Sequence, residues 1–332
     1  MKNLLEHISR YPLVWFLLIN FVITWCVWLL VPTFMGSDWT QQKLMVAAGF
    51  GPAPAALIIT YAQGHTITIN SNRWRGWFFA VFVLLFGLNA SSVLYGDGIT
   101  ADIFAKAHPS DISLTTLIVL FLSSGICAFV TASLVCNSSK NLNSLVTWPA
   151  NKYYLLVALL LPTLWCALGL ATNIVTDTPV VWFSNDDLET LVWLGYIVRS
   201  FLFTLLVVAI GEEAGWRGWM LPHLQQRFSP LMSTVIIGVC WGLWHWPLYM
   251  IGQYPDEPVM VFAKVGVCIM LGVFFTWLYN RSGGNLLLMV LLHTALNNTN
   301  RIIPMTENAG LYLLLIFVAM IYLDKMWKKR PD

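Results

Sequence analysis

Apolar segments long enough to cross a lipid bilayer recur along nearly the whole chain. A transmembrane helix needs about 20 mostly apolar residues, and ten windows with at most one Lys, Arg, Asp or Glu reach or approach that length. These windows are 11–37, 44–72, 76–96, 112–139, 153–176, 190–211, 228–255, 258–280, 282–300 and 308–323. Only 10% of the 332 residues are charged, against about 25% in a soluble globular protein. The sequence therefore predicts an all-α, polytopic transmembrane helical bundle of about ten spans.

The connections between these windows leave no room for a soluble domain. The longest polar connections, 97–111 and 137–152, have about fifteen residues each. No internal repeat of the kind that marks many transporters is visible. The six cysteines lie in or beside apolar runs with no C-x-x-C pair, which argues against a disulfide framework or a thiolate metal site. We expect residues 1–332 to form a single integral membrane domain.

Basic residues are distributed unequally between the two sides of the predicted bundle. With ten spans both termini share a side, and thirteen of the 18 Lys and Arg residues fall on it. Acidic residues gather in the opposite connections, around 97–111, 177–189 and 256–257. The positive-inside rule then places both termini in the cytoplasm, and short loops without a targeting extension fit a bacterial inner membrane. The net charge of +2 gives no basis for a nucleic-acid partner.

Three polar motifs interrupt the apolar sequence between residues 190 and 300. Burying ionisable groups at membrane depth costs at least about 2.5–3.5 kcal/mol each at a helix centre, so they persist mainly where they pair or act. Residues four apart share one face of a helix, so each motif presents its polar groups together. The motifs are Glu212-Glu213-x3-Arg217, Trp241-x3-His245 and His293-x3-Asn297.

The spacing of these motifs predicts a common depth. If a turn at 228–230 joins the sixth and seventh spans, Glu212 and His245 each lie about 21–23 Å from it, at 1.5 Å per residue. His293 lies about 13 Å beyond Gly284 by the same rise. We therefore expect one pocket on the cytoplasmic side or near the middle of the membrane.

Small residues predict two places of close helix packing. The segment 51–56, Gly-Pro-Ala-Pro-Ala-Ala, should kink the second span because proline lacks a backbone donor. Glycines near the carboxylates have no side chains, so another helix can approach closely there. They are Gly211, Gly215 and Gly218.

Each motif also has an interpretation without catalysis. The carboxylates and Arg217 could form a solvated cluster at a helix end, and His245 could be a hydrogen-bonding residue between helices. His293 and Asn297 could hold helices together. Within the spans, Arg199 and Lys264 fit snorkelling or a structural ion pair. The coincidence of depth favours a reaction centre.

In these three motifs the chain resembles the CPBP family of CAAX proteases and bacteriocin-processing enzymes of the Abi type. That family includes the type II CAAX prenyl endoprotease, and its signature is a paired Glu with a following Arg, an aromatic-x3-His and a His-x3-Asn on successive membrane helices. The resemblance covers about residues 190–300, and Trp241 stands where Phe is usual. It implies a CAAX-prenyl-protease-like intramembrane peptidase core at 190–300.

The resemblance also implies roles for the motif residues. Glu212 with His245 would activate a water molecule, and His293 with Asn297 would hold the tetrahedral oxyanion. Imidazole N–H and carboxamide NH2 groups are suitable donors to developing negative charge.

The remaining carboxylate and the arginine have a supporting role by the same resemblance. Glu213 and Arg217 would brace their helix, or Glu213 would contribute a second carboxylate to the base. Glu212, His245 and His293 are the ligands the chain offers to Zn²⁺. Because they do not form H-E-x-x-H, we favour metal-free or metal-optional glutamate catalysis, with zinc as the alternative and no cofactor firmly implied.

The predicted function is that of an intramembrane endopeptidase. Its partners would be membrane lipid and a substrate that is a peptide or a lipidated protein. That substrate would carry a prenyl group or a leader segment. The alternatives are a proton-coupled membrane transporter using the same groups as a relay, and a non-catalytic bacteriocin-immunity protein. The sequence carries no signal for the oligomeric state.

Overall fold

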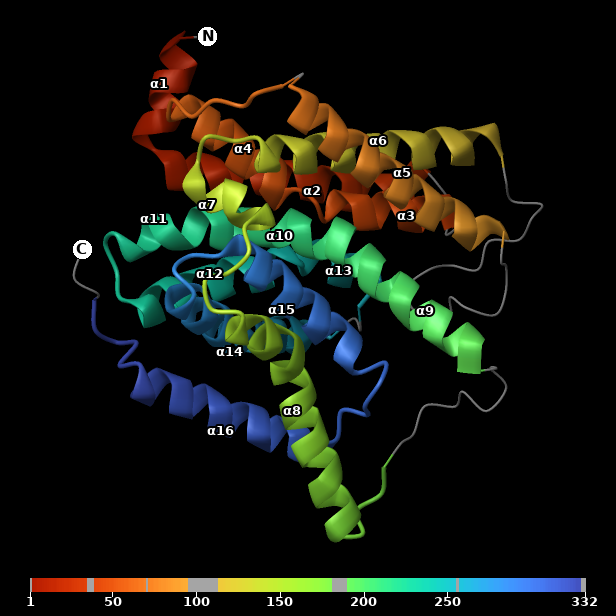
Figure 1. Ribbon diagram of the computed structural model, residues 1–332, viewed down its shortest axis with the longest axis vertical. Helices are drawn as coiled ribbons and strands as arrows, with labels where there is room; N and C mark the ends of the chain where they lie inside the picture. The colour runs from red at the N-terminus through yellow and green to blue at the C-terminus, as the bar shows by residue number, and fades with distance from the viewer. Residues whose placement is uncertain are drawn as a thin grey trace. The chain divides into compact units, whose positions relative to one another are not determined.

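The computed structural model describes residues 2–34, 39–69, 71–94, 113–180, 190–254 and 257–329. Within these ranges the chain is helical with short connections (Figure 1). Extended structure in the described part is limited to an isolated antiparallel bridge between Ile67 and Asn137. The predicted all-α class is confirmed.

The chain forms two compact units, which are described separately. The first unit comprises residues 1–146 and 188–215, and the second comprises 147–187 and 216–332. The helices of the first unit are α1 (Lys2–Arg10), α2 (Pro12–Phe34), α3 (Trp39–Ala48), α4 (Pro52–Ala62), α5 (Asn72–Leu94), α6 (Leu114–Val135), α7 (Lys140–Asn143), α9 (Thr190–Phe203), η3 (Thr204–Ala209) and α10 (Ile210–Gly215). The helices of the second unit are α8 (Tyr153–Val175), η4 (Trp216–Met220), α11 (Leu221–Gln225), α12 (Pro230–Trp244), α13 (Trp246–Met250), α14 (Pro258–Arg281), α15 (Leu286–Thr299) and α16 (Glu307–Leu323).

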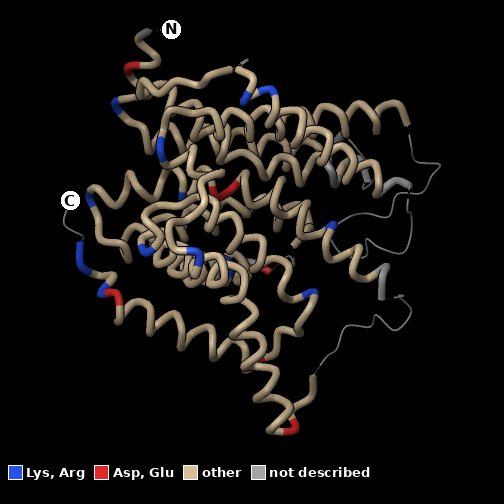
Figure 2. The backbone as a smooth tube through the Cα atoms, in the orientation of Figure 1, with Lys and Arg blue, Asp and Glu red and all other residues tan. Residues whose placement is uncertain are grey.

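These helices have the lengths and composition of membrane spans. Among the described residues, eight helices are long and apolar enough to cross a membrane, and Leu286–Thr299 and Glu307–Leu323 are shorter apolar helices. Each of the ten predicted windows overlaps one of these ten helices, so the predicted polytopic bundle is confirmed. Figure 2 shows long stretches of tube without an acidic or basic residue. The acidic connections 97–111 and 181–189 lie outside the described residues, and the sidedness of the bundle stays a prediction.

The predicted kink of the second span is confirmed at the junction of α3 and α4. Helix α3 ends at Ala48 and α4 begins at Pro52, with a turn between them. Pro52 has no N–H to give to the carbonyl four residues earlier, and the Thr24 hydroxyl of α2 donates to that Ala48 carbonyl at 3.1 Å. A Cβ built on Gly51 would lie 2.1 Å from the Thr24 Oγ1. Glycine is therefore required where α2 crosses the turn.

In the second unit, glycines bring the backbones of α12 and α14 into contact. A Cβ on Gly238 would lie 2.7 Å from the Cα of Ile269, and one on Gly242 would lie 2.6 Å from the Cα of Val265. Small residues at helix interfaces allow close approach inside a membrane, where van der Waals packing replaces the hydrophobic driving force. This contact fixes the end of α12, which carries one of the motif histidines, against the first half of α14.

Helices α8 and α16 of the second unit also pack closely. A Cβ on Gly169 would lie 2.3 Å from the backbone nitrogen of Ala309. Beside this contact, the Asn308 Nδ2 donates to the Asn173 Oδ1 at 2.9 Å. A side-chain hydrogen bond between apolar helices satisfies groups that lipid cannot, so it fixes the register of the pair.

Candidate active site

The helix that carries the carboxylates is continuous but not uniformly α-helical. Residues 193–225 form one helical span, so the helix runs past the carboxylates almost to the turn that the depth comparison assumed at 228–230. On either side of α10 the helix widens into π-helical turns, η3 and η4. Such turns are rare and often occur at functional sites. The chain thus places its paired carboxylates between two deviations from α-helical geometry.

Both carboxylates are withdrawn from solvent. The exposed fraction of Glu212 is 6% and that of Glu213 is 0%. Charged side chains are almost never this buried unless they are paired. Their burial rules out the alternative of a solvated cluster at a helix end.

Glycine contacts fix the depth of the carboxylates within the first unit. A Cβ on Gly211 would lie 2.8 Å from the Cα of Phe50, and one on Gly215 would lie 2.4 Å from the Cβ of Pro52. These glycines, four residues apart, form a small-x3-small interface of the type that membrane helices use for close packing. The expected role of these two glycines is therefore confirmed, and their neighbour is the kinked α3–α4 segment.

The second unit contains the arginine of the first motif, held between two aromatic rings. The guanidinium carbon of Arg217 lies 4.6 Å from the ring centroid of Trp241 and 4.0 Å from that of Phe275. Its exposed fraction is only 1%. A planar guanidinium stacks well on aromatic faces, so the tryptophan of the second motif serves as one wall of an arginine site.

His293 contacts the same two rings. Its ring centroid lies 5.9 Å from both Trp241 and Phe275, inclined at 63° to each, and its side chain is buried. Asn297, one turn later and near the end of α15, is exposed. The two motif residues on α15 therefore differ in burial.

His245 lies at a break in the seventh span. It follows the last residue of α12 and precedes α13, with φ −80° and ψ −4°. Pro247, two residues later, has no N–H for a continuing α-helical ladder, which confirms that the sequence after His245 loosens the helix. The imidazole is buried, and its Nδ1 lies 2.8 Å from the Trp241 carbonyl. A carbonyl only accepts, so Nδ1 donates and Nε2 is the basic nitrogen of the neutral ring.

Three residues of this neighbourhood have no motif in the sequence. Phe275 is one of many aromatics in the apolar run of α14. Tyr254, in the connection after α13, stacks on His245 with ring centroids 6.3 Å apart and planes at 24°. The Lys264 ammonium lies 5.3 Å from the Tyr254 ring centroid. Of the three residues, only Lys264 stands out in the sequence, because it is a charged residue within an otherwise apolar span.

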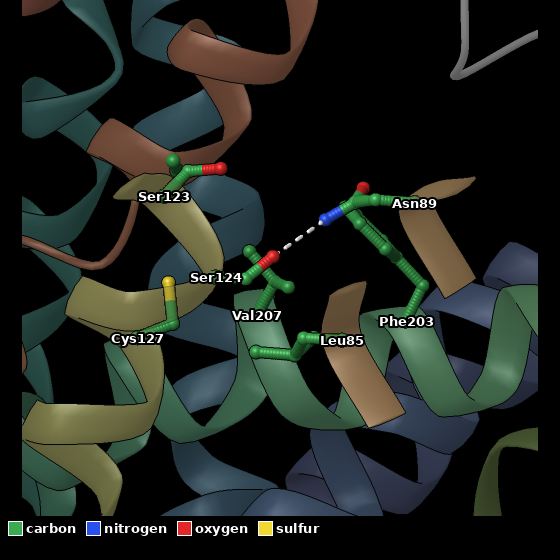
Figure 3. A pocket seen from close by; sticks show the side chains of 8 residues that line it. Leu85, Asn89, Ser123, Ser124, Cys127, Phe203 and Val207 are labelled. Carbon is green, nitrogen blue, oxygen red and sulfur yellow. Dashed lines mark hydrogen bonds between the residues drawn. The ribbon is translucent and has the colours of Figure 1, made fainter. Parts of the chain in front are cut away.

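A small cavity in the first unit lies apart from the motif residues. It has a volume of about 10 Å³ and is lined by apolar side chains and a polar pair (Figure 3). In that pair the Asn89 Nδ2 donates to the Ser124 Oγ at 3.3 Å. The space approaches that of one water molecule, so this cavity cannot hold a peptide.

A metal ion needs several donor side chains gathered around one point. Among the residues that the structure describes, no three His, Cys, Asp or Glu side chains gather closely enough to hold one. Glu212, His245 and His293 stay the ligands that the sequence offers to zinc.

The second unit thus brings together Arg217, His245 and His293 around Trp241, and Asn297 of the same unit is exposed. The first unit buries Glu212 and Glu213 against the α3–α4 turn.

Part of this chain is similar to a known family of proteins. Residues 191–299 match a family model described as type II CAAX prenyl endopeptidase, Rce1-like. A curated protein, CAAX prenyl protease 2 of Methanococcus maripaludis, is 28% identical over 134 residues, covering 37% of this chain and 49% of the relative. The chain therefore matches about half the length of that relative. Residues 191–299, which match the family model, contain all three motifs.

Proposed function

We propose that this chain, whose residues 191–299 match the model of the Rce1-like type II CAAX prenyl endopeptidases, is an intramembrane endopeptidase. One observation carries the proposal: the segment that matches the family contains every polar motif, and the ionisable members of those motifs are buried. Buried ionisable groups in a membrane helix are expensive. Their retention is explained if they perform chemistry.

The first step assigned to the chain is the activation of water. Glu212 and His245 together accept a proton from a water molecule as its oxygen attacks the scissile carbonyl carbon. The proton then passes to the leaving amine nitrogen as the C–N bond breaks. The hydrogen bond from Nδ1 to the Trp241 carbonyl supports this role, because it orients the imidazole and leaves Nε2 to accept.

The second step is stabilisation of the tetrahedral intermediate. We assign this role to His293 and Asn297, whose N–H groups can donate to the oxyanion. The packing of His293 against Trp241 and Phe275 supports the assignment, because a donor acts most strongly when it needs no reorganisation during reaction. Asn297 is exposed, so its carboxamide is accessible to a bound peptide.

Glu213 and Arg217 are proposed as positioning residues. Stacking between two rings holds the Arg217 guanidinium in one orientation. A planar cation held in this way can fix a neighbouring carboxylate through paired N–H groups.

The proposed substrate is a peptide bond in a membrane-associated protein that carries a prenyl group or a leader segment. The similarity to the Methanococcus maripaludis protein named CAAX prenyl protease 2 supports the prenylated class of substrate. We further propose that the chain acts as one integral domain in a bacterial inner membrane with both termini in the cytoplasm, as its basic residues indicate.

The test is hydrolysis of prenylated and leader peptides by the purified protein in liposomes. Changing Glu212→Gln or His245→Ala should lower kcat by about 10²–10⁴-fold, the usual contribution of a general acid or base. The exposed Glu257 supplies a matched control, and Glu257→Gln should retain the wild-type rate. Unchanged hydrolysis in both site variants would refute the assigned roles. Proton-driven solute uptake without hydrolysis would favour a transporter instead.

A further inference from the structure

An apolar groove lies along helix α8 in the second unit. It has a volume of about 620 Å³, within the range of about 300–1,000 Å³ that is usual for ligand pockets. Its walls are side chains of α8 from Tyr153 to Ala167, most of them three or four residues apart, and the ring of Trp277 on α14. Tyr153 and Ala167 are fourteen residues apart, which corresponds to about 21 Å of helix. One leaflet of the bilayer core is about 15 Å thick, so the groove can hold an acyl chain along its length.

The groove lies on the side of α14 opposite to the motif residues. Trp277 follows Phe275 by two positions, so the two side chains point about 200° apart around the helix, at about 100° per residue. Phe275 contacts the Arg217 guanidinium and the His293 ring, whereas Trp277 lines the groove. A chain bound in the groove therefore lies away from the groups proposed for catalysis.

Two cations lie at one end of the groove. Lys152 is exposed and directly precedes Tyr153, the first groove residue of α8. Arg281 follows Trp277 by four residues, so it lies one turn later on the same face of α14. The Tyr154 hydroxyl interacts electrostatically with the Arg281 guanidinium, and the ring centroids of Tyr153 and Tyr154 are 6.0 Å apart. These contacts connect the start of α8 to the end of α14.

This end of the groove stays basic although one of its cations is paired. The Arg281 Nε donates to the Asp324 carboxylate at 2.9 Å, and a terminal nitrogen donates to the other oxygen. Arginine has five N–H donors, and the side chain of Arg281 is 51% exposed, so donors remain for a ligand. The end of α16 lies here as well, because Asp324 directly follows it, and the chain continues with the exposed Lys325, Lys328 and Lys329. A basic end on an apolar groove is complementary to an anionic headgroup on an acyl chain.

We propose that the groove binds an anionic phospholipid, with one acyl chain along α8 against Trp277 and the phosphate between Lys152 and Arg281. The lysine ammonium and the remaining guanidinium N–H groups donate to the phosphate oxygens. The bound lipid would hold the start of α8 against the end of α14. A prenyl chain carries no phosphate, so it would use the apolar walls without the cations. The site does not depend on the proposed peptidase function.

The experiment measures lipid binding to the purified protein by native mass spectrometry. The probes are phosphatidylglycerol and phosphatidylcholine with identical acyl chains. Wild-type protein should bind phosphatidylglycerol about tenfold or more tightly than phosphatidylcholine, as expected for charge-assisted hydrogen bonds. Lys152→Gln should remove most of that difference. Leu160→Trp, which fills the groove, should weaken the binding of both lipids.

Two further variants are matched controls. Ile174 lies on α8 two turns beyond Ala167, and its exposed fraction is 59% against 55% for Leu160. Ile174→Trp should therefore bind both lipids as the wild type does. Arg227 is an exposed cation of the same unit that does not line the groove, and Arg227→Gln should keep the wild-type preference. Thermal unfolding in detergent checks that each variant is folded, and the exposed Lys152 keeps the test valid if Leu160→Trp is not.

Three results would overturn the inference. Equal binding of the two lipids by the wild type would mean that the groove selects no headgroup. Equal losses in Lys152→Gln and Arg227→Gln would mean that the preference comes from the overall surface charge. Displacement of bound phosphatidylglycerol by a farnesylated peptide in the wild type, but not in Leu160→Trp, would assign the groove to a prenyl chain.

Discussion

Gly215→Ala tests whether the carboxylate helix depends on its contact with the α3–α4 turn. The added Cβ would lie 2.4 Å from the Pro52 Cβ and 2.6 Å from the Pro52 carbonyl oxygen, whereas ordinary contacts are 3.4–4 Å. The helices must therefore separate by about 1 Å. Overpacking of this kind costs about 1–3 kcal/mol, and the higher helix propensity of alanine returns up to about 1 kcal/mol.

The expected result is a net loss of about 1–2 kcal/mol in the free energy of unfolding and a larger loss of activity. Glu212 and Glu213 move with the helix, and a 1 Å misplacement of a catalytic group can cost about 10²-fold in rate. Thermal unfolding in detergent measures the first quantity, and peptide hydrolysis at saturating substrate measures the second.

Gly195 provides the matched control for this prediction. It lies earlier in the same helix, and a Cβ there meets nothing within 4 Å. Gly195→Ala should be neutral or slightly stabilising, with wild-type activity. If Gly215→Ala behaves like Gly195→Ala in both assays, the contact does not position the carboxylates.

Two further substitutions test separate parts of the structure. Arg217→Lys keeps the charge but loses the planar stack on two aromatic rings 4.6 Å and 4.0 Å away, so kcat should fall by about tenfold or more with little change in KM. A wild-type rate would show that charge alone suffices. Asn20 buries an amide whose oxygen and nitrogen have no hydrogen-bond partner among the described residues. Asn20→Leu should therefore raise the free energy of unfolding by about 1–3 kcal/mol, and a lower midpoint of thermal unfolding would contradict this.

The helical architecture could be predicted from the sequence because a long apolar segment that crosses a membrane must form a helix. A backbone in lipid must satisfy its own polar groups, so each apolar window predicted a helix and each overlaps one. The kink at Pro52 and the break after His245 were predictable for a related reason, because proline lacks a donor wherever it occurs.

The contacts of the site were less accessible to sequence reasoning. Helical spacing showed that Trp241 and His245 share a face, but the partners of Arg217 depend on which helices pack together. Phe275 therefore had no distinguishing signal among the aromatics of α14. The spacing placed Asn297 beside His293 but could not show that Asn297 is exposed while His293 is buried. The π-helical turns beside the carboxylates could not be predicted either, because no spacing of residues in the sequence marks them.

The double variant Glu212→Gln/His245→Ala tests the central claim, that both residues activate one water molecule in a single catalytic centre. Groups that act as a unit are strongly non-additive. We expect kcat of the double variant to equal that of the slower single variant, with all three proteins showing wild-type thermal unfolding. A double variant whose loss equals the product of the two single losses would show that Glu212 and His245 act independently, and the proposed mechanism would be wrong.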